Sequence, residues 1–120
     1  MPMREKMTVQ ATRRIQCGGT VFGPGIARLL EGVRDHGSLR QSASEMGMSY
    51  NKAWHVVRES ETRLGFPLLA RKVGGARGGG AELTAQGAEL LARYRAFETE
   101  AQAALAALAE RHFEGMEGAE

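Results

Sequence analysis

The chain has 120 residues, of which 42% are hydrophobic and 25% are charged, a composition typical of one soluble globular domain. It contains no apolar run near 18 residues, which excludes a membrane-spanning helix, and its polar start does not resemble a signal peptide. Cys17 is the only cysteine, which excludes an internal disulfide and favours a reducing compartment. We therefore expect a cytoplasmic protein with an idle thiol.

The net charge of +2 conceals an uneven distribution of charged residues along the chain. Residues 1–81 hold 13 Lys and Arg against 6 Asp and Glu, a net charge of +7, whereas residues 82–120 hold 3 against 8, a net charge of −5. A basic front and an acidic tail suit a protein that presents one surface to a polyanion. A solvated charge pattern without a partner is the alternative.

The first third of the chain predicts a hairpin and a scaffold helix. Residues 1–7 are polar and without period, and we expect them to be disordered. Residues 8–16 favour a strand, which a turn at 17–20 would join to a second strand at Val21. Residues 24–36 then predict a helix, because proline suits a first turn and apolar residues recur at helical spacing. That stripe consists of Ile26, Leu29, Leu30 and Val33.

Residues 37–58 predict two short helices joined by a tight turn. Ser38 and Ser49 are placed to cap the two helices, since a serine oxygen accepts from the free N–H groups of a first turn. Gly47 can adopt the positive φ that the turn needs. Two helices joined by a short glycine-containing turn are the usual frame of a helix-turn-helix that reads DNA.

The second of these helices has one apolar and one polar face. Ala53, Val57 and Leu64 fall together, with Trp54 beside them, and we interpret Trp54 as a packing residue. The opposite face is rich in donors that could reach base edges or phosphates. An ordinary amphipathic surface helix would show the same division. The polar face comprises Asn51, Lys52, His55, Arg58, Glu59 and Thr62.

A strand, a glycine-rich loop and a second strand follow, over residues 68–73, 74–80 and 81–84. After a helix-turn-helix, such a hairpin is a wing. Arg77 at its tip, with Arg71 and Lys72 at its base, could lie along a phosphate backbone or enter a minor groove. The loop does not match a nucleotide-phosphate loop, because that pattern needs Lys-Ser or Lys-Thr opening a helix after the last glycine, whereas Ala81 and Glu82 follow here.

Residues 85–112 predict one long helix, capped by Thr84. It would run about 42 Å, which exceeds the width of about 30 Å that a domain of this size would have. The far end would therefore project, and its apolar stripe would need a partner, which we take to be the same helix of a second copy, packed antiparallel. A tail that folds back or frays is the alternative. The stripe comprises Leu90, Leu91, Tyr94, Phe97, Ala101, Ala104, Leu105 and Leu108, and we expect residues 113–120 to be disordered.

The residues do not predict an enzyme. Asp35 is the only aspartate, and the three histidines fall on three separate elements. No cysteine–histidine spacing suits a metal, and no serine–histidine–aspartate set has an evident scaffold. We therefore predict no catalytic residues, no metal and no cofactor.

Several motifs in this order resemble the amino-terminal DNA-binding domain of the molybdate-responsive ModE regulators, over roughly residues 8–112. The Leu-Thr-x-x-Gly after the wing also resembles the LysR-type regulators, whose DNA-binding domain is a winged helix with a long dimerisation helix. The motifs are Gly-Pro-Gly before the first helix, Gly37-Ser38-Leu39, Met48-Ser49-Tyr50 with Lys52-Ala53-Trp54, the glycines of residues 74–80, and Leu83-Thr84-Ala85-Gln86-Gly87.

The resemblance implies residue roles. By similarity, the residues that would enter the major groove are Ser49, Tyr50, Asn51, Lys52 and His55. Arg58 is added to this set because it lies on the same polar face of the helix. Phosphates would be contacted by Ser38 and Gln41, with Arg40 beside them on the outer face of its helix, and Arg77 would lie on the wing. The dimer contacts that we expect are Leu90, Tyr94, Phe97, Ala101, Leu105 and Leu108.

Together these features predict a mainly α fold with a small β-hairpin: a winged helix-turn-helix over residues 8–84 and a dimerisation helix over 85–112. The expected function is a homodimeric, sequence-specific, double-stranded DNA-binding transcriptional regulator. Full-length molybdate regulators carry a second, molybdate-binding region after the long helix, which we do not find in these 120 residues. We therefore do not expect this chain alone to bind molybdate. A winged helix that binds proteins, or a non-specific architectural DNA binder, is the alternative.

Overall fold

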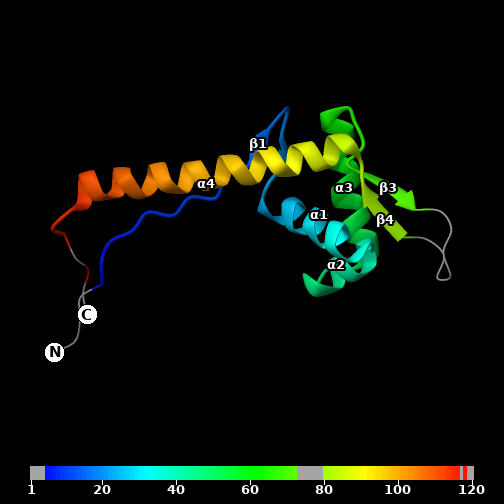
Figure 1. Cartoon of the computed structure of the whole chain (residues 1–120), viewed down its shortest axis with the longest axis horizontal. Helices are drawn as coiled ribbons and strands as arrows, with labels where there is room; N and C mark the ends of the chain where they lie inside the picture. The colour runs from blue at the N-terminus through cyan, green and yellow to red at the C-terminus, as the bar shows by residue number, and fades with distance from the viewer. Residues whose placement is uncertain (1–4, 73–79, 117, 119–120) are drawn as a thin grey trace.

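The computed structural model describes residues 5–72, 80–116 and 118. Three helices and the start of a fourth, long helix surround one core at one end of the molecule (Figure 1). The predicted fold class is confirmed: the fold is mainly helical with small antiparallel hairpins, and the chain is a winged helix-turn-helix followed by a long helix. The elements are β1 (Ile15–Gln16), β2 (Thr20–Phe22), α1 (Pro24–His36), α2 (Leu39–Glu45), α3 (Tyr50–Leu64), β3 (Leu69–Lys72), β4 (Gly80–Leu83) and α4 (Ala85–Phe113).

Helices α1, α2 and α3 form the core of the winged domain. Leu29, Leu30 and Val33 of α1 are buried, as the stripe predicted, whereas Ile26 is half-buried. Helix α2 approaches α1 closely at Gly32, where a Cβ atom would overlap the side chain of Ser42. The hydroxyl of Ser42, itself buried, donates to the carbonyl of Leu29 over 2.8 Å. This contact holds α2 against α1, and α3 packs on both helices.

Three hydrogen bonds hold the backbone of the wing segment to α3 and to the end of α1. Strands β3 and β4 pair antiparallel, with Leu69 opposite Leu83 and Lys72 opposite Gly80. The carboxylate of Glu61 on α3 accepts from the backbone N–H groups of Leu68 and Leu69, over 2.6 and 3.2 Å. The N–H of Ala81 donates to the carbonyl of Gly37, just after α1, over 3.1 Å. The base of the wing is therefore anchored to both α1 and α3.

The N-terminal hairpin is shorter than predicted. The strand expected over residues 8–16 is limited to Ile15–Gln16, because only these residues find a partner, in β2. The predicted turn is confirmed, with Gly18 and Gly19 at φ of 67° and 135°, values that favour glycine. Val21 and Phe22 are fully buried, whereas Cys17 is exposed.

Helix α4 is one residue longer than predicted and projects far beyond the winged domain (Figure 1), which gives the molecule extents of 60 × 34 × 20 Å. Its first half packs on the domain through Gly87, Leu91 and Tyr94, which are buried. The N-terminal segment runs beside its second half (Figure 1), where the Lys6 ammonium lies 3.6 Å from the Glu110 carboxylate. Within the described residues, no helix combines the length and apolar character needed to cross a membrane.

Candidate nucleic-acid interface

Both helix caps predicted for the helix-turn-helix are confirmed. The Ser38 hydroxyl oxygen accepts from the backbone N–H of Gln41, and that of Ser49 from the N–H of Lys52, each over 3.1 Å. Gly47 between the helices has a φ of 68°, in the left-handed region, as the turn requires. These local interactions position the start of α3. In a helix-turn-helix, the residues at the start of the second helix are those that contact bases.

The two faces of α3 are divided as predicted. Ala53 and Val57 are buried in the core, and Ser60 is buried beside them. The polar face is open to solvent. Its exposed residues include Asn51, Lys52, His55 and Arg58, and Ser49 at the cap is exposed as well.

Tyr50 and Trp54 of α3 occupy an intermediate position between these faces. Both are half-buried and pack against the core, as predicted for Trp54. Their rings meet edge to face, with centroids 6.5 Å apart. The Trp54 ring also faces two arginines, since the guanidinium carbons of Arg58 and Arg71 lie 4.9 and 5.0 Å from its centroid. Trp54 therefore contacts charged groups of the surface as well as the core.

The three residues assigned to phosphate contacts lie at the start of α2. Arg40 and Gln41 are exposed, whereas Ser38 is half-buried at its cap. The Arg40 guanidinium carbon lies 4.2 Å from the centroid of the Tyr50 ring, in cation–π geometry. Arg40 is therefore brought to the edge of the recognition helix rather than left on the far side of α2.

The base of the wing carries two exposed cations, of which Arg71 reaches Trp54 of α3. Arg71 and Lys72 are both exposed on β3. Arg77, predicted at the tip of the wing, lies outside the described residues.

Acidic side chains on the exposed face of α3 are engaged by neighbours. The Glu59 carboxylate lies 3.7 Å from both His55 and Arg63, and the Glu61 carboxylate is occupied by the backbone of the wing. Among the described residues, no ion pair includes Arg40, Lys52, Arg58 or Arg71. The face therefore carries uncompensated positive charge, which suits a polyanion.

The fold buries one part of the apolar stripe predicted for dimerisation and leaves another part exposed to solvent. Tyr94 is only 2% exposed, which corrects its assignment as a dimer contact: its ring packs edge to face on Phe22, with centroids 5.1 Å apart. Its hydroxyl lies 2.8 Å from the carbonyl oxygen of Arg13, and burial beside the Glu98 carboxylate raises its pKa. By contrast, Phe97 and Leu108 are 59% and 45% exposed. Leu90, Ala101 and Leu105 are half-buried.

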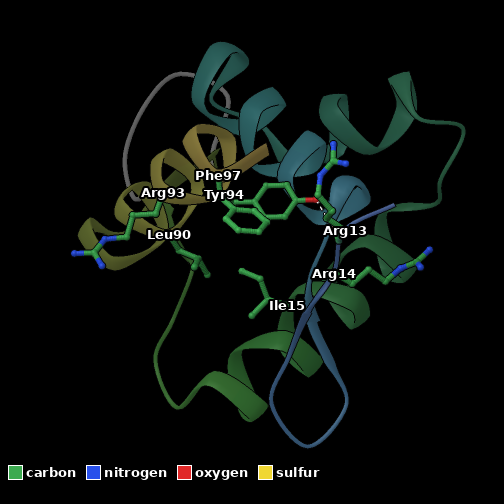
Figure 2. A pocket seen from close by; sticks show the side chains of 7 residues that line it. All are labelled: Arg13, Arg14, Ile15, Leu90, Arg93, Tyr94 and Phe97. Atoms are coloured by element: carbon green, nitrogen blue, oxygen red, sulfur yellow. Dashed lines mark hydrogen bonds between the residues drawn. The ribbon is translucent and has the colours of Figure 1, made fainter. Parts of the chain in front are cut away.

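A cavity of about 470 Å³ lies between the N-terminal segment and the first half of α4 (Figure 2). Its walls are apolar, and arginine side chains surround it with their charged ends directed outward (Figure 2). The residues that line it are Arg13, Arg14, Ile15, Leu90, Arg93, Tyr94 and Phe97.

Helix α4 is fastened to α1 by an ion-pair network. Arg95 donates through two nitrogens to the two carboxylate oxygens of Glu31, over 2.8 and 2.5 Å, and through a third to Glu98 over 2.5 Å. The hydrogen bond from Arg95 lowers the pKa of Glu31, and its own pKa is raised by the two carboxylates. The direction in which α4 leaves the domain therefore depends partly on this network.

Sequence reasoning missed the surface role of Trp54 and the anchoring role of Glu61. The spacing of Trp54 and Arg58, four residues apart on a helix, could have revealed the first of the two ring contacts. Nothing local indicates that Arg71 from β3 meets the same ring, or that the Glu61 carboxylate accepts from the start of β3. These contacts join segments that only the tertiary structure brings together.

The fold and this exposed, basic recognition helix define a winged helix-turn-helix of the DNA-binding kind. A model of the bacterial regulatory helix-turn-helix proteins of the lysR family matches residues 27–88, and the chain belongs to that family. The match extends from α1 through the wing to the start of α4, so it includes the whole candidate interface.

Relatives with curated names are molybdenum-related regulators and binding proteins, which confirms the resemblance seen in the sequence. The chain is 39% identical over 93 residues to the molybdenum transport protein ModE of Azotobacter vinelandii, which covers 78% of this chain and 34% of that protein. It is 38% identical over 80 residues to the molybdenum-pterin-binding protein MopB of Rhodobacter capsulatus, covering 67% and 30%. It is 38% identical over 66 residues to the DNA-binding transcriptional dual regulator ModE of Escherichia coli K12, covering 55% and 25%. The chain thus spans about a third or less of the length of these relatives.

A solved structure supports the fold. The crystal structure of ArgP from Mycobacterium tuberculosis superposes with a TM-score of 0.50 at 23% identity, over 70% of this chain and 30% of that one.

Proposed function

We propose that this chain binds double-stranded DNA in a sequence-dependent manner, as a homodimer, and serves as the DNA-binding part of a transcriptional regulator. The observation that carries the proposal is the exposed polar face of α3, with Asn51, Lys52 and His55 near its capped start, in a domain of the lysR family. Amide and amine donors at these positions suit adenine and guanine edges in a major groove.

Three further groups extend the proposed interface. Ser38, Arg40 and Gln41 would contact phosphates beside the recognition helix, and Arg71 and Lys72 would do so from the base of the wing. Phosphate contacts supply most of the affinity, whereas the base contacts of α3 supply specificity. The domain boundaries that we propose remain 8–84 for the winged domain and 85–112 for the dimerisation helix.

The proposal of a dimer through α4 rests on exposed apolar groups and on charge. Phe97, at the cavity beside the first half of the helix, is 59% exposed, and Leu108 and Phe113 in the second half are 45% and 42% exposed. Residues 97–114 hold four glutamates against one arginine, whereas three arginines surround the apolar cavity near the start of the helix. Antiparallel packing of two copies would bring the acidic half of one helix to the basic cavity of the other.

The experiment for DNA reading is selection of bound duplexes from a random pool at fixed salt, with and without molybdate, since several relatives are named for molybdenum. We expect an inverted repeat whose half-sites lie about 34 Å, or a multiple of this distance, apart. Duplexes without a shared motif would contradict sequence reading and support backbone binding alone. No recovery at low salt would contradict DNA binding and favour a protein partner, and a molybdate effect would reveal an oxyanion site on this chain.

A variant pair sharpens the assignment of the reading face. We expect Asn51→Ala to cost about 1–3 kcal/mol at one base position and to relax specificity there. Gln102→Ala removes an exposed amide from α4 and should leave the recovered motif unchanged. An equal loss of affinity by Asn51→Ala on every duplex would contradict the assignment.

The dimer is tested by the mass in solution as a function of concentration. We expect Phe97→Ser to raise the dimer dissociation constant by at least about tenfold without unfolding the chain, because an exposed aromatic anchor is removed from the interface. Ala96→Ser, at an exposed neighbouring position, is the matched control. A chain that is monomeric at all concentrations, or a dimer unaffected by Phe97→Ser, would contradict an interface through this part of α4.

A further inference from the structure

Three arginines from three different elements gather on two aromatic side chains of α3. Arg40 of α2 lies 4.2 Å from the ring centroid of Tyr50, and Arg58 of α3 and Arg71 of β3 lie 4.9 and 5.0 Å from that of Trp54. The two rings are themselves in edge-to-face contact. We call these five residues the arginine–aromatic cluster. At this cluster α2, α3 and strand β3 of the wing meet.

The electrostatics of this cluster favour an anionic ligand. Like charges repel when they are held close together, and the ring faces offset only part of that repulsion. The three guanidinium groups are exposed, and no carboxylate of the described residues pairs with any of them. Elsewhere, Arg63, Arg93 and Arg95 are each paired with a glutamate.

The grouping of the arginines suits a nucleic-acid backbone. Arg58 and Arg71 lie on one ring, so their guanidinium carbons are at most about 10 Å apart, close enough for both to contact one strand, whose phosphates are spaced about 3.4 Å along the axis. The indole nitrogen of Trp54 is buried. What this side chain offers at the surface is therefore the face of its ring.

We propose that Tyr50 and Trp54 are positioning residues that hold Arg40, Arg58 and Arg71 as one phosphate-binding unit, and that Trp54 thereby couples the wing to the recognition helix. The inference rests on the proposed DNA-binding function and extends it, because the two aromatic residues act through the arginines rather than by reading bases. Flexible arginine side chains lose conformational freedom when they bind, and a ring that orients them beforehand reduces that loss.

The test is a double-mutant cycle on DNA binding, with Trp54→Leu, Arg71→Gln and the double variant, measured on the selected duplex and on a random duplex at several salt concentrations. Arg71→Gln should lower the salt slope by about one unit. Trp54→Leu should weaken binding to both duplexes by roughly 2- to 30-fold, the range expected for cation–π contacts. The double variant should bind no more than about twofold more weakly than the weaker single variant, because each change removes the same oriented contact.

Controls separate positioning from a merely structural role. Arg111→Gln removes the same charge at the far end of α4, and its effect should multiply with that of Trp54→Leu. If the circular dichroism spectrum shows that Trp54→Leu is unfolded, a cycle of Arg58→Gln with Arg71→Gln replaces the cycle that contains Trp54→Leu. Both arginines are exposed and contact the same ring. There, too, the combined loss should be smaller than the product of the single losses.

Two outcomes would overturn the inference, and they differ. Effects of Trp54→Leu and Arg71→Gln that multiply, in a chain that still binds DNA, would overturn the coupling and leave the proposed function standing. A wild-type chain that binds no duplex even at low salt would overturn the proposed function and this inference with it.

Discussion

The first half of α4 packs against the winged domain, whereas the second half projects away from it (Figure 1). In the first half Leu91 and Tyr94 are buried, and Arg95 is bound to Glu31 of α1. In the second half Leu108 and Phe113 are 45% and 42% exposed, and alanines dominate the sequence. The helix is continuous, but its two halves are supported differently. The first half packs on the winged domain, whereas helix propensity and contacts with the N-terminal segment, which include the buried Ala109, support the second half.

The largest effect is expected at Tyr94, the main packing contact of the first half. Tyr94→Ala should lower the free energy of unfolding by about 3–5 kcal/mol, because it leaves a cavity beside Phe22. Urea denaturation measures this loss. Tyr94→Phe keeps the ring and removes only the hydroxyl, so it should cost about 1 kcal/mol. If Tyr94→Ala lowered the free energy of unfolding by less than about 1 kcal/mol, the division of α4 into a packed and a projecting half would be contradicted.

A smaller loss is expected at Gly87, where α4 passes the start of the wing. A Cβ atom there would overlap the backbone carbonyl of Leu68, so Gly87→Ala should cost about 1–3 kcal/mol even though alanine favours a helix. The control is Gly25→Ala, because no atom lies within 4 Å of the Cβ that it would add to α1. Equal thermal stability of the two variants would show that α4 can move away from the wing at no cost.

The ion pair between Glu31 and Arg95 should make the attachment of α4 pH-dependent. The pKa of Glu31 is lowered in the folded chain, so the pair stabilises the fold above the ordinary glutamate value of 4.5, and this contribution is lost as the pH falls through the folded value. Because the Arg95 side chain is 38% exposed, we expect Glu31→Gln to cost only about 1 kcal/mol near neutral pH.

Unfolding of wild type and variant at several pH values tests this prediction. The difference in stability should disappear in acid. Glu100→Gln, at an exposed position on α4, should show no such pH-dependent difference. A constant gap between wild type and Glu31→Gln at all pH values would argue against the ion pair as its source.

The smallest effect on stability is expected in the projecting half. Leu108→Ser should change the free energy of unfolding by no more than about 0.5 kcal/mol in dilute solution, because the side chain is 45% exposed. The matched change in the packed half, Leu91→Ser, should cost more than about 2 kcal/mol. Similar losses at the two positions would show that a second copy covers Leu108 even in dilute solution.

Much of the fold could be predicted because the relevant signals are local. The capping serines, the glycine turn and the apolar spacing of α1 and α3 act within a few residues, and all are confirmed. The strand predicted over residues 8–16 was too long, because strand formation depends on a partner that the local sequence does not specify. The assignments of individual residues to DNA contacts stay predictions.

By itself, the amino-acid sequence determined the order of the elements, the caps and the two faces of α3, since helical periodicity and capping chemistry are set by neighbouring residues. Only the tertiary structure decided which long-range contacts form: Arg71 on the ring of Trp54, Glu61 on the start of β3, and Tyr94 inside the domain rather than on a dimer surface. The physical reason is that these contacts depend on how separate elements pack, and packing geometry is not encoded in the spacing of residues along one element.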